Sequence, residues 1–215
     1  MDFFMVISSA LFFILFAFLM FVFIVYIISI FIKRDFPDYE PKVSIVIPVY
    51  NEEKNIGDCL DSVMSSNYPR KKFEIIVVDD GSTDSTKDVV KKYSGIKLLF
   101  QLHKGKSEAL NLGAMAAKSG FVMAIDADTV IDRNCIKEIV KPLSDKTIGA
   151  TTGISNVKNN KGILGMFQNI EYHYNNLIRN SFSKVFKNGI WFFGALACYR
   201  KSALEKAGYF KTSTL

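Results

Sequence analysis

The hydrophobic pattern of the chain begins with one long apolar segment. Residues 3–32, FFMVISSALFFILFAFLMFVFIVYIISIFI, contain no charged residue, proline or glycine. As a helix, at about 1.5 Å per residue, this segment is roughly 45 Å long, which exceeds the ~30 Å hydrocarbon core of a bilayer. It predicts one membrane crossing with some tilt, because two crossings need about 40 residues and a polar turn. A secretory signal peptide is the alternative, but its apolar region is only about 7–15 residues long and follows basic residues, whereas this chain starts with MDFF.

The residues next to the apolar segment predict its orientation. Lys33 and Arg34 follow it directly, whereas the residues before it carry only an acid, Asp2. Positively charged residues stay on the cytoplasmic side of a span, so we expect a single-pass anchor in the cell membrane with the rest of the chain facing the cytoplasm. The expected parts are a transmembrane helix within 1–34, a proline-containing linker at 35–41 and one folded domain over 42–215.

Beyond the linker, apolar strands alternate with amphipathic helices. Continuous apolar or β-branched runs predict four strands, at 42–49, 73–80, 96–101 and 121–126. Helical spacing of apolar residues predicts a helix after each strand, at 52–66, 85–93, 107–118 and 133–143. Strands that are apolar on both faces and alternate with helices are typical of a parallel sheet covered on both sides, so the pattern predicts an α/β fold.

The pattern changes in the last third of the chain. Residues 147–157 predict a further strand, and residues 163–186 form a long aromatic-rich amphipathic stretch that we expect to lie against the sheet or a membrane surface. Trp191 and Phe192 open the next apolar stretch, where we expect core packing, with an acceptor path as the alternative.

Charge and cysteine content narrow the partners. The formal net charge is +6, but the basic residues are spread along the chain without a run of five, a distribution that does not favour nucleic acid. Anionic lipid beside the apolar segment, or a phosphate-bearing substrate, accounts for this charge equally well. Cys59, Cys135 and Cys198 are odd in number and far apart, which predicts free thiols in a reducing compartment. His103 and His173 stand apart from them, so a zinc site is not indicated.

Acidic clusters follow three of the predicted strands. They are PVYNEE (48–53), VDDGSTD (78–84) and DAD (126–128). Because ligands of parallel sheets bind beyond the carboxyl ends of the strands, we expect the three clusters on one rim. Three unrelated helix caps are the alternative, and Asp84 taken alone fits that role. Crowded carboxylates repel one another unless a positive charge joins them, so this rim predicts a divalent cation.

The chemistry of such a rim suits a nucleoside diphosphate. Asp126 and Asp128 on a hard cation leave coordination positions open for phosphate oxygens, and a carboxylate of the second cluster can accept a hydrogen bond from a base N–H. Lys104 and Lys106 precede a predicted helix, where cations and the helix N-terminus attract phosphate; a solvated loop is the alternative. The first strand is not followed by G-x-G-x-x-G, and no G-x-x-x-x-G-K-[ST] occurs, which excludes dinucleotide dehydrogenases and P-loop proteins.

Four segments together resemble the family 2 glycosyltransferases. They are VSIVIPVYNEE, EIIVVDDGSTDST, HKGKSEALN and AIDADT, in this order over roughly residues 42–135. FQNIEY and FFGALACYRKSALEKAGYF are similar to the processive membrane subgroup, which includes chitin, hyaluronan, cellulose and poly-N-acetylglucosamine synthases. The resemblance implies a GT-A fold, a Rossmann-like, mostly parallel α/β sheet flanked by helices, preceded here by one transmembrane helix. It also implies an inverting enzyme that transfers sugar from a UDP-sugar to a polysaccharide or lipid-linked acceptor.

The resemblance further implies which residues bind the donor and its metal. They are Pro48, Tyr50 and Glu52 in the nucleotide pocket, Asp80 with Asp79 at the uracil, Lys106 near the phosphates, and Asp126 with Asp128 as the D-x-D motif. Within that motif, Asp128 is expected to be the direct ligand of Mg²⁺ or Mn²⁺, and Asp126 is expected to face the donor sugar or ribose.

The general base that removes the acceptor's proton is not assigned within the chain. The resemblance places it in a Thr-Glu-Asp motif shortly after a segment like GYFKTSTL, so we expect it beyond Leu215, in a longer protein of which this chain is a C-terminally truncated form. Two alternatives remain open. One is a nucleotide-sugar-binding fragment without turnover, and the other is a non-processive transferase that acts on a polyprenyl phosphate.

Overall fold

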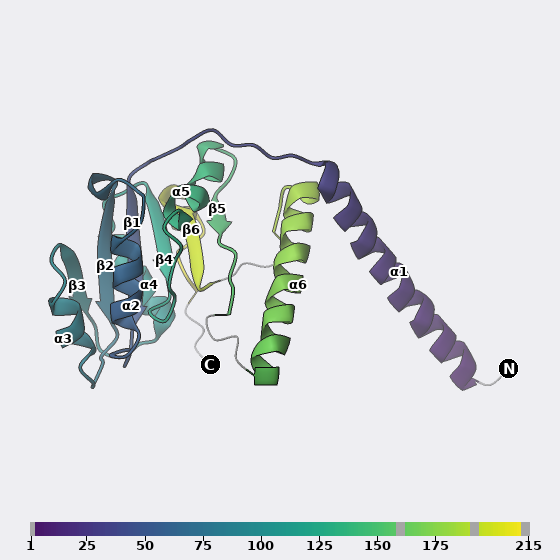
Figure 1. Ribbon diagram of the computed structural model, residues 1–215, viewed down its shortest axis with the longest axis horizontal. Helices are drawn as coiled ribbons and strands as arrows, with labels where there is room; N and C mark the ends of the chain where they lie inside the picture. The colour runs from purple at the N-terminus through teal and green to yellow at the C-terminus, as the bar shows by residue number, and fades with distance from the viewer. Residues whose placement is uncertain (1–2, 158–161, 190–193, 212–215) are drawn as a thin grey trace. The chain divides into compact units, whose positions relative to one another are not determined.

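A six-stranded sheet, ordered β3-β2-β1-β4-β6-β5, forms the centre of the larger part of the chain (Figure 1). The computed structural model describes residues 3–157, 162–189 and 194–211. The strands are β1 (Val43–Val49), β2 (Phe73–Asp79), β3 (Ile96–Phe100), β4 (Phe121–Ile125), β5 (Ala150–Thr152) and β6 (Leu196–Arg200). The first four are parallel, whereas β6 runs antiparallel to both β4 and β5. The predicted α/β fold with a mostly parallel sheet is confirmed.

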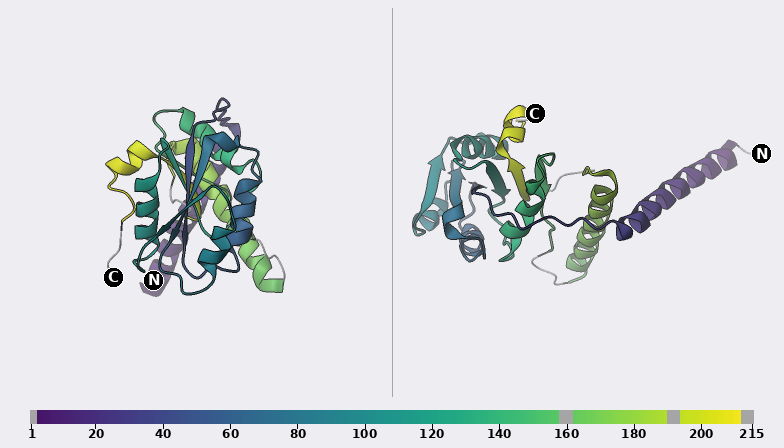
Figure 2. Two further views of the ribbon diagram at one scale, coloured as in Figure 1. Left: turned by 90° about the vertical axis from the view of Figure 1, so that its left-hand side faces the viewer. Right: turned by 90° about the horizontal axis from the view of Figure 1, so that it is seen from above.

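Helices cover both faces of this sheet, as the end-on view shows (Figure 2, left). The helices are α2 (Ile56–Met64), α3 (Thr86–Lys91), α4 (Lys106–Ala116), α5 (Cys135–Val140) and α7 (Lys201–Lys206), with short 3-10 turns η1 (Arg70–Lys72) and η2 (Lys141–Ser144). Alternate β1 residues point to opposite faces, so that Ile45 and Ile47 pack with α2, α3 and α5, whereas Val46 packs with α4. All seven residues of β1 are buried, which explains its continuous apolar sequence.

Two predicted elements differ from the structure. The strand expected over 147–157 is limited to the three residues of β5, because only these pair with β6. β6 was not predicted as a strand: its sequence, LACYR, is too short and too mixed for periodicity to identify. The three cysteines are free thiols, as expected. Trp191 and Phe192 lie outside the described residues.

The strand order also fixes where a ligand can bind. β1 lies between β2 and β4. The chain passes from β1 to β2 and β3 on one side, and then returns to β4 on the other side, so the strand order reverses at β1. Such a reversal opens a crevice at the carboxyl ends of the strands. The three acidic clusters follow β1, β2 and β4 and therefore meet at this crevice.

The contacts of the chain divide it into two compact units, one of residues 36–153 with 193–215 and the other of residues 1–35 with 154–192. The second unit consists of α1 (Phe3–Phe31) and α6 (Gly162–Phe186). The Ser29 and Ser181 hydroxyls are hydrogen-bonded at 3.1 Å, and the Phe21 ring meets Phe182 edge to face. The Arg34 guanidinium donates to the Lys184 carbonyl near the end of α6, at 3.0 Å. Among the described residues, α1 alone is long and apolar enough to cross a membrane.

Candidate active site

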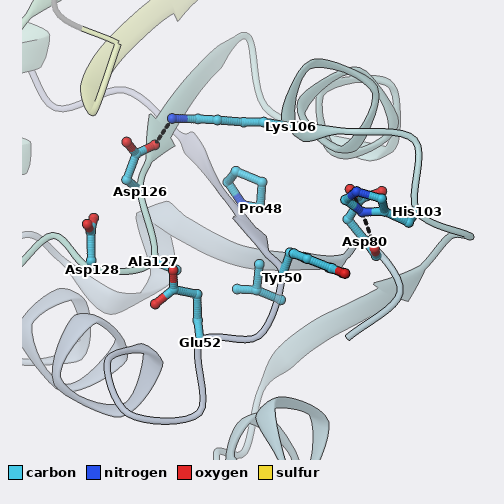
Figure 3. A pocket seen from close by; sticks show the side chains of 10 residues that line it. Pro48, Tyr50, Glu52, Asp80, His103, Lys106, Asp126, Ala127 and Asp128 are labelled. Atoms are coloured by element: carbon cyan, nitrogen blue, oxygen red, sulfur yellow. Dashed lines mark hydrogen bonds and ion pairs between the residues drawn. The ribbon is translucent and has the colours of Figure 1, made fainter. Parts of the chain in front are cut away.

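The predicted site residues lie around one pocket at the edge where the parallel strands end (Figure 3). The pocket has a volume of about 300 Å³ and is lined by Pro48, Val49, Tyr50, Glu52, Asp80, His103, Lys106, Asp126, Ala127 and Asp128. Seven of the eight residues predicted from the sequence are among them, and Asp79 is not. Asp80 and Asp128 thus share one cavity, as a common binding site requires.

One end of the pocket is acidic and contains a single lysine. Asp126 and Asp128 lie in the turn after β4, which is closed by a hydrogen bond from the Thr129 amide to the Asp126 carbonyl at 3.0 Å. Lys106, the first residue of α4, reaches across the pocket, and its Nζ lies 2.5 Å from Asp126 Oδ1. Asp128 is exposed, and within the described part of the chain its carboxylate makes no hydrogen bond or ion pair. Its oxygens are therefore available to a ligand.

The other end of the pocket is built on Asp80. Its Oδ1 accepts hydrogen bonds from Gln101 Nε2 at 2.6 Å and the Lys104 amide at 2.8 Å, and its Oδ2 accepts one from the Gly105 amide at 2.9 Å. Burial by itself raises the pKa of Asp80, but these hydrogen bonds outweigh burial and hold the pKa below its usual value. Asp80 is therefore a carboxylate that fastens the loop before α4 to the sheet.

Residues 44–208 match the family of proteins described as Glycosyl transferase family 2. This chain belongs to glycosyl transferase family 2.

The curated relatives of this chain include poly-beta-1,6-N-acetyl-D-glucosamine synthases. The chain is 36% identical over 180 residues to the poly-beta-1,6-N-acetyl-D-glucosamine synthase of Staphylococcus epidermidis, and 32% identical over 182 residues to that of Staphylococcus aureus strain COL. Both matches cover 80% of this chain and 43% of the relative, so the chain spans less than half of these proteins.

Two solved structures share the fold. The mannosyltransferase PcManGT from Pyrobaculum calidifontis, solved with GDP-Man and Mn²⁺, is 29% identical, with a TM-score of 0.72 over 91% of this chain and 55% of its own. TarS residues 1–349 from Staphylococcus aureus, solved with UDP-GlcNAc, is 23% identical, with a TM-score of 0.57 over 79% of this chain and 48% of its own. The expected GT-A fold is confirmed.

The acidic end of this glycosyltransferase fits a divalent cation that the substrate helps to hold. Asp126 and Asp128 offer hard oxygen ligands side by side, and Glu52 lies on the same side of the pocket (Figure 3). Within the described ranges no group of three or more His, Cys, Asp or Glu forms a complete metal cage. Mg²⁺ commonly binds in this way, through one or two carboxylates and the phosphates of its substrate.

Asp79 does not line the pocket, whereas Asp80 does. The expectation was that Asp79 and Asp80 together hold the uracil. The Asp79 side chain is fully buried, with Oδ1 accepting the Ser82 amide at 2.8 Å. Its Oδ2 accepts no hydrogen bond and instead lies 3.4 Å from Lys87 Nζ. Adjacent residues of a strand point to opposite faces, so only Asp80 is directed into the pocket. Asp79 stabilises the turn after β2.

Hydrogen bonds from backbone amides to side-chain oxygens join the turns after β1 and β2. Asn51 adopts a left-handed conformation, with φ 55°, and its Oδ1 accepts the Thr83 amide at 2.8 Å. The Glu52 amide donates to Thr86 Oγ1 at 2.8 Å, and the Glu53 amide donates to Asp84 Oδ2 at 3.1 Å. Asp84 Oδ1 also accepts the Thr86 amide at the start of α3, although the N-cap residue of this helix is Ser85 and not Asp84 as the sequence suggested.

His103 is the principal pocket residue that the sequence did not identify. Its imidazole stacks on the Tyr50 ring with centroids 4.2 Å apart. Its Nδ1 lies 2.9 Å from Asp80 Oδ2. The available signal was its position directly after β3, at the same edge of the sheet as the acidic clusters.

The thiol of Cys59 lies behind the acidic pair and donates to the Asp126 carbonyl at 3.6 Å. Burial, together with the smaller effect of the charges of Asp128 and Asp126, raises the pKa of this thiol to about 12. Cys59 is therefore a neutral packing residue rather than a nucleophile.

Proposed function

We propose that this chain binds a UDP-sugar with Mg²⁺ or Mn²⁺ in the pocket and serves a glycosyltransferase that extends a polysaccharide or glycosylates a lipid-linked acceptor. The observation that carries the proposal is the convergence of Asp80, Lys106 and the Asp126–Asp128 pair on one cavity. A cavity of about 300 Å³ that is aromatic at one end and acidic at the other matches a base joined to a metal-bound diphosphate.

In this proposal the chain's own residues bind and orient the donor. Pro48, Tyr50 and Glu52 line the nucleotide pocket, Lys106 lies beside the phosphates, and Asp128 holds the cation with Asp126. The acceptor hydroxyl attacks the anomeric carbon in line, the bond from that carbon to the diphosphate breaks with inversion, and UDP leaves. The cation, when bound, neutralises charge on the leaving diphosphate. The acceptor's proton goes to a general base, which is not assigned to a residue of this chain.

The relatives indicate the first substrates to test. Because the chain is similar to poly-beta-1,6-N-acetyl-D-glucosamine synthases, UDP-N-acetylglucosamine is the first donor, and a chain of the same sugar is the first acceptor. A polyprenyl phosphate is the second acceptor. A ladder of products on a gel supports polysaccharide extension, and a single glycolipid band supports the polyprenyl reaction.

Calorimetric titration of UDP with Mn²⁺ tests the metal site. Asp128→Ala is expected to weaken metal-dependent UDP binding by about tenfold or more, because Asp128 is the proposed direct ligand. Asp88→Ala is the matched control, since Asp88 is exposed on α3 and pairs only with Lys91 among the described residues. Unchanged affinity in Asp128→Ala contradicts the proposed site. Binding by the unmodified chain without sugar transfer or donor hydrolysis supports a binding fragment instead.

We also propose that α1 spans the cell membrane, with the remainder of the chain on its cytoplasmic side. Support comes from the length and composition of α1, and from the two basic residues, Lys33 and Arg34, that follow it. Impermeant maleimide labelling of Lys71→Cys in intact and permeabilised cells tests the sidedness. Labelling is expected only after permeabilisation, and labelling of intact cells would refute this orientation.

The exposed apolar face of α6 is proposed to lie against the same membrane. Residues three or four apart form one stripe and are 46–77% exposed: Ile163, Phe167, Ile170, Tyr174 and Leu177. The next position along this face, Ser181, is buried and bonded to Ser29 of α1, so the same helix contacts the proposed span. A polarity-sensitive dye on Phe167→Cys should shift to the blue with lipid vesicles, whereas the same dye on the exposed Gln168→Cys, which lies away from the stripe, should not. Equal responses would exclude a lipid-facing stripe.

A further inference from the structure

His103 is held in one orientation by two independent contacts. Its Nδ1 lies 2.9 Å from Asp80 Oδ2 and 3.1 Å from the Asp80 carbonyl oxygen, which fixes the rotation of the ring. The face of the ring stacks on Tyr50, with 28° between the planes, which fixes its tilt. The side chain is nevertheless 58% exposed and forms part of the pocket wall (Figure 3). An exposed side chain with a fixed orientation is suited to contact a ligand.

The turn that carries Asp80 brings the His103 loop unusually close. Gly81 has a φ of +82°, and a Cβ at this position would lie 3.0 Å from the His103 backbone nitrogen. Glycine is therefore required both for the left-handed turn and for the close approach. The loop is fastened by backbone contacts as well as by the His103 side chain.

Asp80 itself has no remaining capacity to bind a nucleobase. A carboxylate offers about four lone-pair positions. Three donors bond to this one, Gln101 Nε2 and the Lys104 and Gly105 amides, and His103 Nδ1 lies 2.9 Å from its Oδ2. The residue is only 3% exposed. A base N–H that bound to Asp80 would have to displace one of these donors. The contact with uracil that the sequence suggested for Asp80 therefore needs another acceptor.

The arrangement provides that acceptor on His103. The Asp80 carbonyl oxygen that is hydrogen-bonded to Nδ1, and the ionised carboxylate beside it, can only accept, so Nδ1 carries the proton. In neutral imidazole Nε2 then carries the lone pair, and within the described part of the chain no hydrogen bond occupies it. At its N3 position uracil presents an N–H donor, whereas cytosine presents a lone pair. A fixed acceptor on the pocket wall therefore distinguishes these two bases.

We propose that His103 is the specificity-determining residue of the nucleotide site: its Nε2 accepts the N3–H of uracil, and Asp80 is the positioning residue that orients the ring. This inference rests on the proposed function, because it needs a nucleoside diphosphate in the pocket. It replaces direct recognition of uracil by Asp80 with recognition through His103.

Calorimetry of UDP and CDP with Mn²⁺ tests the inference on the full chain in detergent. The unmodified protein should bind UDP at least about tenfold more tightly than CDP, because cytosine N3 and His103 Nε2 are both acceptors and repel each other. His103→Phe keeps a ring that can stack on Tyr50 but lacks Nε2, so UDP affinity should fall about tenfold, whereas CDP affinity should not fall, because the repulsion between two acceptors is removed. Leu102→Ala is the control from the same loop, since Leu102 is exposed and does not line the pocket. It should keep the selectivity.

A second measurement needs no substitution in the protein. UDP methylated at N3 has no N–H to donate, so it should bind the unmodified chain about tenfold more weakly than UDP. Equal binding of the two ligands, or a His103→Phe variant that loses UDP and CDP affinity in parallel, overturns the role of His103 while leaving the proposed function intact. Absence of any Mn²⁺-dependent UDP binding by the unmodified chain overturns both.

Discussion

Asp80→Asn is the most informative single change in the pocket, because it keeps the shape of the side chain and removes its charge. Asparagine retains one acceptor oxygen but replaces the other with an NH₂ group, which only donates. In one orientation of the amide, the NH₂ group faces Gln101 and the Lys104 amide, which lie at Oδ1 of Asp80. In the other orientation it faces the Gly105 amide and His103, which lie at Oδ2.

The magnitude follows from counting these bonds. Two hydrogen bonds to a charged acceptor are lost, each worth about 1.5–3 kcal/mol, and partial relaxation of the loop brings the expected loss of unfolding free energy to about 3 kcal/mol. For a chain of this size, this loss corresponds to a fall in the melting temperature of about 6–12 °C. UDP-over-CDP selectivity should decline as well, because the variant releases His103.

Urea unfolding followed by circular dichroism measures the effect, with Asp88→Asn as the control. Asp88 is a surface residue whose side chain is 75% exposed, so its substitution should change stability by less than about 0.5 kcal/mol. An Asp80→Asn midpoint equal to that of the unmodified chain would refute the role assigned to Asp80.

The pH dependence supplies a second refutation. The pKa of Asp80 is lowered in the folded chain, so its stabilisation is complete above the ordinary aspartate pKa of about 4 and is lost as pH falls through the lower folded value. The stability gap between the unmodified chain and Asp80→Asn should therefore be constant near neutral pH and narrow below about pH 4. A gap that widens in acid would contradict this account.

Three further results are expected. Gly113→Ala should lower the urea midpoint, because its Cβ would lie 2.3 Å from Val46 Cγ1. The resulting overpacking costs about 1–3 kcal/mol, whereas the gain in helix propensity is about 1 kcal/mol. Gly57→Ala is the control and should not lower the midpoint, because its Cβ would lie 3.5 Å from the nearest atom. Lys106→Gln should weaken UDP binding several-fold in calorimetry at low salt and less at high salt, because screening reduces charge attraction. Burial raises the pKa values of the three thiols to about 11 or 12, so Ellman's reagent should react rapidly with none of them until the chain is unfolded.

The sequence predicts the parallel part of the sheet well because three of its four strands, β1, β2 and β4, are buried on both faces. Strands β1, β2 and β4 are therefore continuous apolar runs, and the polar cluster after each run marks its end. β6 could not be predicted in the same way. It joins the sheet beside β4 from a distant part of the chain, and its pairing depends on tertiary contacts that LACYR does not encode locally.

The candidate site was predictable to the level of residue clusters but not of individual side chains. Asp79 and Asp80 are the same residue type, so the sequence alone does not show which of the two side chains faces the pocket. That choice depends on the register in which β2 pairs with β1. His103 was set aside as an isolated histidine because Tyr50 and Asp80, which hold it, belong to other strands. Contacts between strand ends follow from the fold rather than from spacing along the chain.

The two ends of the pocket impose different requirements on any ligand, and together they favour one orientation. At one end Asp80 is saturated by donors, so the surface offered there is aromatic, with one imidazole nitrogen free among the described residues. At the other end Asp126 and Asp128 carry two negative charges, and Lys106 neutralises only the first. A bare diphosphate would be repelled by the uncompensated carboxylate, whereas a diphosphate that arrives with a divalent cation would not. When the cation takes over the neutralisation of Asp126, the ammonium of Lys106 can turn to the phosphates. Cation and nucleotide should therefore bind cooperatively, with the base directed toward His103 and the sugar toward Asp126.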